Sequence, residues 1–143
     1  DLLHQILTSA SVLHDQGIVH RDIKPSNVMC QANFDRDTLE ILDVNKPFIH
    51  CVLGDYSSAW NHYTVEHLYT GGMSPAEQTD EYAPPEAKLF GSSSSSSFSS
   101  SSSWEPFYEG KPETYDSWSI GVLALELLLG TPNVFSVDQR TIA

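Results

Sequence analysis

The feature that most restricts the fold is the run YDSWSIGVLALELLLG at residues 115–130. Its apolar side chains surround the helix axis instead of following one stripe, which is typical of a helix buried on all sides. The run contains Glu126 and is too short to span a bilayer. Asp116 or Ser117 can cap its start, and Gly130 can end it. We therefore expect a buried central helix around which the rest of the chain packs.

The remaining sequence predicts a mixed α+β structure. Apolar residues within 2–14 recur on one helical face, and Gly17 provides a stop after that helix. Residues 38–42 and 47–53 have the composition of strands. From residue 55 to 81 the apolar periodicity is lost, which predicts a long loop.

A low-complexity segment interrupts the chain before the central helix. The tract SSSSSSFSSSSS occupies residues 92–103. Such a composition cannot bury a core, so we expect a flexible, dispensable insert over 91–103.

Charge and cysteine content restrict the partners and the compartment. The formal net charge is −12 with only seven Lys and Arg, which argues against nucleic-acid binding because phosphate neutralisation needs clustered basic residues. Cys30 and Cys51 form no CxxC motif and no disulfide framework, and we interpret them as small apolar strand residues. The sequence contains no signal-peptide pattern and no membrane segment. We expect a reducing compartment, namely the cytoplasm, with the nucleus as the alternative.

The densest group of reactive side chains lies in the stretch IVHRDIKPSN. A carboxylate can orient an attacking hydroxyl and accept its proton, an ammonium can contact a transferred phosphoryl group, and an amide oxygen suits Mg²⁺. Asp22, Lys24 and Asn27 supply these groups. With His20 and Arg21 they form the pattern His-Arg-Asp-x-Lys-x-x-Asn, which resembles the catalytic loop of eukaryotic protein kinases of the serine/threonine branch. The resemblance implies a catalytic role for His20, Arg21, Asp22 and Lys24. It also implies that Lys24 contacts ATP and that Asn27 contacts both ATP and Mg²⁺.

Asp55 follows the strand 47–53 where this family has its metal-binding Asp-Phe-Gly motif. The resemblance implies that Asp55 binds Mg²⁺ and the cofactor. Tyr56 replaces the Phe, and its ring can still pack beneath the loop. Ser57 replaces the Gly, which removes easy access to positive φ and is expected to restrict movement between active and inactive arrangements.

The stretch TDEYAPPE resembles the end of a kinase activation segment. The resemblance implies that Thr79 lies in the substrate cleft, where its hydroxyl bridges the catalytic Asp and Lys, and that Glu86 is structural. It also implies that Asp116 accepts hydrogen bonds from backbone amides of the catalytic loop. Arg21 is a candidate partner for a phosphate in the loop that follows Asp55. The candidate phosphosites there are Thr64, Thr70 and Ser74.

The resemblance covers the mainly α-helical carboxy-terminal lobe of a kinase-like fold, with short β-hairpins around the catalytic loop. It describes a partial domain over 1–143, comprising the catalytic loop 18–29, the metal-binding Asp and activation segment 55–86, the Ser-rich insert 91–103 and the central helix 115–130. We find no Gly-rich phosphate loop and no lysine for the α- and β-phosphates. We therefore expect that the amino-terminal lobe is absent and that this chain alone is inactive or a poor kinase.

Several readings stay open. The segment YDSWSIGVLALELLLGTPNVFSVDQRT resembles plant proteins that join a kinase domain to a type 2C protein phosphatase, which implies a fused or associated phosphatase domain. Tyr56 and Ser57 favour the alternative of a catalytically inactive, kinase-like binding or regulatory module. A metalloprotein built on His62, Glu66 and His67 is disfavoured, because this spacing does not place both histidines on one helical face. The main reading is a serine/threonine kinase that acts on a protein substrate with ATP and Mg²⁺.

Overall fold

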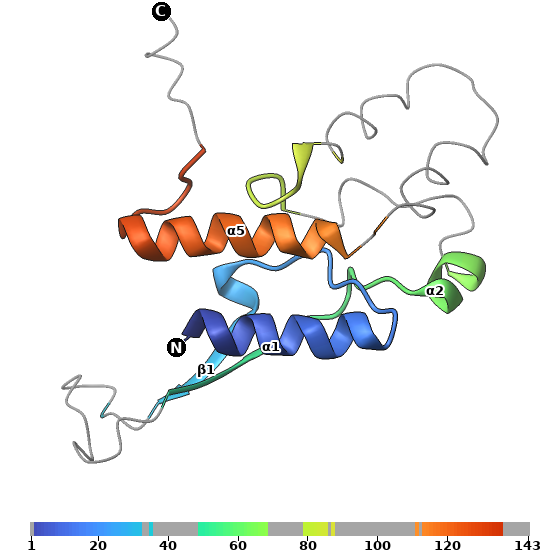
Figure 1. Cartoon of the computed structure of the whole chain (residues 1–143), viewed down its shortest axis with the longest axis horizontal. Helices are drawn as coiled ribbons and strands as arrows, with labels where there is room; N and C mark the ends of the chain where they lie inside the picture. Colours follow the sequence, from blue (N-terminus) through green and yellow to red (C-terminus); the bar gives the residue numbers. More distant parts are fainter. Residues whose placement is uncertain are drawn as a thin grey trace, which may run out of the picture.

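The computed structural model describes residues 2–32, 35, 49–68, 79–85, 87, 111 and 113–135. Its elements are α1 (Leu2–Asp15), the 3₁₀ turn η1 (Pro25–Asn27), β1 (Val28–Ala32), β2 (Ile49–Leu53), α2 (His62–His67) and α5 (Thr114–Leu129). The predicted α+β class is confirmed (Figure 1). Some predicted features lie outside the described residues: the strand 38–42, the insert 91–103, Glu86, Thr70 and Ser74.

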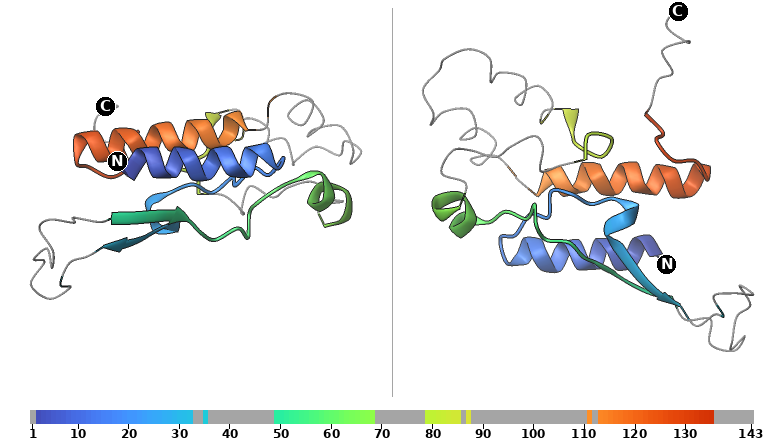
Figure 2. Two further views of the ribbon diagram at one scale, coloured as in Figure 1. Left: turned by 60° about the horizontal axis from the view of Figure 1, so that its bottom comes forward. Right: turned by 180° about the vertical axis from the view of Figure 1, so that it is seen from behind.

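The two long helices lie side by side and run in opposite directions (Figures 1 and 2). Their facing apolar side chains form one core cluster, together with side chains from the catalytic-loop stretch and from β2. The members of this cluster are Ile6, Ala10, Ile23, Leu53, Ile120 and Leu123. The predicted stop after α1 is confirmed, because Gly17 has a φ of 67° and its amide donates to the carbonyl oxygen of His14.

The central helix α5 differs from its prediction at the start and in its burial. It begins at Thr114, so Asp116 lies inside its first turn instead of capping its start. The Asp116 side chain is fully buried. The predicted end is confirmed: Gly130 has a φ of 64°, and its amide donates to the Glu126 carbonyl oxygen. The prediction that this helix is buried on all sides is wrong within the described part of the chain, where Leu128 is 82% exposed and Leu129 is 65% exposed.

The strands β1 and β2 form an antiparallel two-stranded sheet that packs against α1. Their register places Cys30 directly opposite Cys51, and the two cysteines form a disulfide with Cα atoms 4.1 Å apart. The interpretation of Cys30 and Cys51 as strand residues is confirmed, but the reading that they belong to no disulfide is wrong. The physical reason is that cross-strand register, which spacing along the sequence does not reveal, decides which side chains meet.

The predicted loop after Asp55 contains a short helix, α2, so the loop prediction is wrong at this point. The helix starts with a capping box, in which the Asn61 side chain accepts from the Thr64 amide and the Thr64 side chain accepts from the Asn61 amide. Within α2, His62 Nδ1 lies 3.2 Å from Glu66 Oε1. The described residues contain no group of three potential metal ligands among His, Cys, Asp and Glu. None of the described helices is both long and apolar enough to cross a membrane.

Candidate active site

One buried carboxylate on α5 holds the stretch from residue 18 to 27. Asp116 is fully buried, and its two oxygens accept the backbone amides of His20 and Arg21, each at 2.8 Å. This predicted contact is confirmed. A third donor was not predicted: His14 of α1 places its Nε2 2.8 Å from Asp116 Oδ2. This hydrogen bond is the main reason why the pKa of His14 is raised.

His20 connects the loop to the end of β2. Its Nε2 donates to the Gly54 carbonyl oxygen at 3.0 Å, and its Nδ1 accepts from the Asp22 amide at 3.4 Å. The ring is therefore the tautomer with the proton on Nε2. His20 is completely buried, so its contacts are with neighbouring residues, which it helps to position.

Arg21 is also a buried positioning residue. Its backbone has a φ of 68°, and its guanidinium donates to the Ser58 carbonyl oxygen at 3.3 Å. The guanidinium carbon lies 6.0 and 5.8 Å from the ring centroids of Trp60 and Tyr115, a cation–π arrangement. Of its candidate phosphate partners, Thr64 uses its hydroxyl in the cap of α2.

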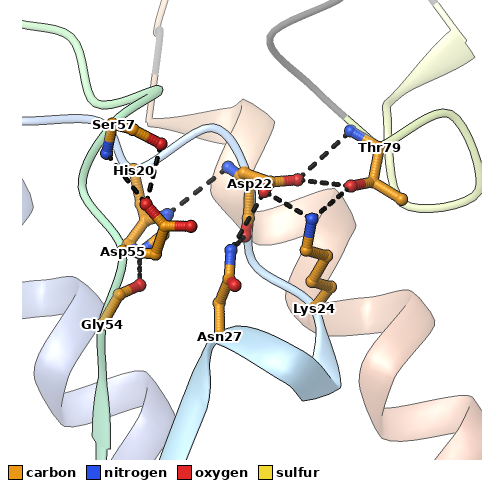
Figure 3. A network of polar contacts seen from close by, with 8 residues as sticks. All are labelled: His20, Asp22, Lys24, Asn27, Gly54, Asp55, Ser57 and Thr79. Atoms are coloured by element: carbon orange, nitrogen blue, oxygen red, sulfur yellow. Dashed lines mark hydrogen bonds and ion pairs between the residues drawn. The ribbon is translucent and has the colours of Figure 1, made fainter.

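Asp22 is the centre of a network of polar contacts (Figure 3). Its Oδ1 accepts from the Thr79 hydroxyl at 2.7 Å and from the Thr79 amide at 3.1 Å. Its Oδ2 lies 2.7 Å from Lys24 Nζ and accepts from Asn27 Nδ2 at 3.0 Å. Lys24 also donates to the Thr79 hydroxyl at 2.7 Å, so the predicted bridge by Thr79 is confirmed.

These contacts keep Asp22 ionised. Burial is the largest single influence and would raise the pKa of this carboxyl, but hydrogen bonds from Lys24, Thr79 and Asn27 outweigh it and lower the pKa. At neutral pH the side chain is therefore a carboxylate that can accept hydrogen bonds.

Asp55 lies at the same site with its backbone in the left-handed region, at a φ of 57°. The Ser57 hydroxyl and amide donate to its Oδ1 at 2.7 and 3.3 Å, and these bonds are the main cause of its lowered pKa. The Tyr56 ring packs 5.1 Å from the His20 ring, as predicted, and its hydroxyl donates to the Leu53 carbonyl oxygen at 3.0 Å. Ser57 is not among the described residues with positive φ, so this conformation needs no glycine there.

The oxygen donors at this site suit Mg²⁺. Asn27 uses its amide nitrogen for the Asp22 carbonyl and carboxylate, which directs its amide oxygen elsewhere. The Ser57 amide and hydroxyl both donate to Oδ1 of Asp55, so these two bonds do not use Oδ2. A carboxylate and an amide oxygen are hard ligands, and Mg²⁺ sites in proteins commonly combine one or two such groups with substrate phosphates. The residues present therefore fit the ion.

A second connection between the site and α5 was missed from the sequence. The Tyr82 hydroxyl donates to Glu126 Oε2 at 2.7 Å, and the Ser119 hydroxyl donates to the Tyr82 carbonyl oxygen at 2.9 Å. Burial and the Glu126 carboxylate raise the pKa of Tyr82, which keeps its hydroxyl protonated. These bonds hold residues 79–85 against the helix. No local pattern signals them, because Tyr82 and Glu126 are 44 residues apart.

The comparisons with known proteins agree with this geometry. The pattern of the protein kinase domain family matches residues 1–143. The chain is 38% identical over 145 residues to a probable inactive protein kinase of Arabidopsis thaliana, covering 98% of this chain and 36% of the relative. It is 30% identical over 143 residues to a calcium/calmodulin-dependent protein kinase type 1 of Macrobrachium nipponense, covering 99% and 31%. The chain therefore spans about a third of the length of these relatives.

Solved structures show the same fold. The yeast RNA Pol II CTD kinase CTDK-1 complex matches with a TM-score of 0.57 at 21% identity, over 97% of this chain and 33% of the other. A Stt7 homolog from Micromonas algae matches with a TM-score of 0.52 at 24% identity, over 87% and 32%. Because the family model matches the whole of residues 1–143, the chain belongs to the protein kinase domain family.

Proposed function

We propose that this chain provides the catalytic-loop half of a serine/threonine kinase, which transfers the γ-phosphoryl group of Mg²⁺-ATP to a hydroxyl group of a protein. The observation that supports this most directly is the convergence of Asp22, Lys24, Asn27 and Asp55. Lys24 lies 2.7 Å from Asp22, and the charges of both residues influence the pKa of Asp55, which is 33 positions further along the chain than Asp22.

The chain's own residues would act mainly by position and charge, because phosphoryl transfer needs little covalent help. Asp22 would orient the attacking hydroxyl and take up its proton on the carboxylate. Lys24 would offset the negative charge of the transferred group while it keeps Asp22 in place. Asn27 and Asp55 would hold Mg²⁺, which supplies positive charge against the phosphate oxygens when bound.

A second candidate function is a kinase-like binding or regulatory module without transfer activity. It is supported by the hydrogen bond from Ser57 to Asp55, which competes with a metal for Oδ1. The Arabidopsis relative is named as a probable inactive kinase. The narrower resemblance to kinase–phosphatase fusions and the expected compartment remain predictions.

Binding of Mg²⁺-ATP separates the two candidates. In the full-length natural protein, calorimetric titration with ATP is run with and without Mg²⁺ for the wild type and Asp55→Ala. Asp15→Ala, which removes an exposed carboxylate at the end of α1, is the matched control. Mg²⁺-dependent binding that is lost only in Asp55→Ala supports the kinase. No Mg²⁺-dependent binding in the wild type would reject it and leave the binding module.

A further inference from the structure

Cys30 on β1 and Cys51 on β2 form a pair that is suited to reversible bonding. The Cys51 amide donates to Gln5 Oε1 of α1 at 2.9 Å instead of to the neighbouring strand. This identifies Cys30 and Cys51 as a non-hydrogen-bonded pair of the ladder, the arrangement in which facing side chains are closest. The register therefore keeps the two sulfur atoms within reach of each other even when the bond between them is broken.

The same ladder leads directly into the candidate Mg²⁺ site. Two steps from the cysteine pair, Val28 faces Leu53. One step further, the Gly54 amide donates to the Asn27 carbonyl oxygen at 2.8 Å. Asn27 and Asp55 are the two residues whose oxygens would hold the metal. A covalent link between the strands therefore restrains the distance between both candidate ligands.

The two cysteines differ in access. Cys30 is exposed, whereas Cys51 is only 2% exposed. Cys30 also borders a cavity of about 290 Å³ between α1, β1 and α5. An external thiol can therefore reach the Cys30 sulfur, and the buried partner is protected from alternative reactions.

We propose that Cys30 and Cys51 are a thiol–disulfide modification site that controls how firmly the Asn27–Gly54 end of the hairpin is closed. The disulfide form closes this end and tightens binding of Mg²⁺-ATP, and this second effect rests on the proposed function. The reductant is a dithiol. One of its thiolates attacks the Cys30 sulfur, the protein S–S bond breaks, and Cys51 leaves as a thiolate that takes up a proton. The second thiol of the reductant then releases Cys30 as a thiol.

This exchange is balanced. Two electrons and two protons pass from the dithiol to the protein, one disulfide breaks in the protein and one forms in the reductant. The reverse reaction, with an oxidised dithiol, restores the bond between Cys30 and Cys51.

The test uses the full-length natural protein after equilibration with oxidised or reduced dithiothreitol. Free thiols are alkylated, and peptides that contain Cys30 and Cys51 are identified by mass spectrometry. Amide hydrogen exchange is then measured at Gly54, followed by titration with Mg²⁺-ATP. Cys30→Ser removes the bond at the exposed position, while Gln31→Ser changes an exposed neighbour on β1 and keeps both cysteines.

The expected result is a linked Cys30–Cys51 peptide in the oxidised protein and two alkylated cysteines after reduction. Reduction should speed exchange at Gly54 and weaken Mg²⁺-ATP binding on the order of tenfold, a typical coupling between two sites. Gln31→Ser should respond like the wild type, and Cys30→Ser should not respond. Two free thiols under oxidising conditions, or equal Gly54 exchange in both states, would overturn the proposal. Equal Mg²⁺-ATP affinity in both states would also overturn it. A different outcome is that no state binds nucleotide while exchange at Gly54 still depends on the redox state. That outcome would reject the kinase function and uphold the modification site.

Discussion

Replacing Asp116 by Asn tests whether one buried carboxylate holds the catalytic loop. Asp116 Oδ1 accepts from the Arg21 amide, and Oδ2 accepts from the His20 amide and from His14. An asparagine has the same shape but only one accepting oxygen. In either orientation of the amide, one buried backbone N–H therefore faces an NH₂ group.

The magnitude follows from these contacts. A hydrogen bond to a charged group contributes about 1.5–3 kcal/mol, and leaving a buried donor unsatisfied costs about 1–3 kcal/mol. Because the two effects overlap at one amide, we expect Asp116→Asn to lower the free energy of unfolding of this domain by about 2–4 kcal/mol. Hydrogen exchange at the amides of His20 and Arg21 should become faster.

The assay is urea unfolding of the full-length protein followed by tryptophan fluorescence, since Trp60 is buried beside Arg21. Glu113→Gln makes the same chemical change at an exposed residue that caps α5 without a side-chain hydrogen bond. Its effect should stay within about 0.5 kcal/mol, as for most surface substitutions. If Asp116→Asn also stays within that limit, this carboxylate does not anchor the loop.

Three further predictions concern single side chains near the site. The pKa of His14 is raised above its ordinary value of 6.5, so its charged bond to Asp116 stabilises the fold fully below about pH 6.5 and loses this effect as the pH rises through the raised pKa. His14→Gln should remove this pH dependence in unfolding curves, and an unchanged dependence would exclude His14 as its source. A Cβ on Gly54 would collide with Met29 Cε, so Gly54→Ala should lower the free energy of unfolding by about 1 kcal/mol. Adding Met29→Ala should restore the lost stability. A loss that persists in the double variant would place the strain elsewhere. Asp22→Asn should lower the turnover of the full-length protein by roughly two to four orders of magnitude, and unchanged turnover would show that Asp22 is not the base.

Several elements could be predicted from the sequence because their signals are local. The spacing of apolar residues and the positions of Gly17 and Gly130 correctly predicted α1 and the end of α5, since helix periodicity and left-handed glycines act within one or two turns. The capping box of Asn61 and Thr64 is also a local signal, and it would have revealed α2. The contacts of Thr79 and Asp116 with the catalytic loop were predicted through the family resemblance and not through any local pattern.

The sequence by itself therefore determined the two long helices, the polar loop and the residue types available for phosphoryl transfer. The tertiary structure alone decided which distant side chains meet. Cys30 pairs with Cys51 because strand register sets the two opposite each other, and His14 reaches Asp116 across 102 residues because α1 packs beside α5. Periodicity and capping report interactions between near neighbours, whereas these contacts depend on how complete elements pack, which a single sequence pattern does not encode.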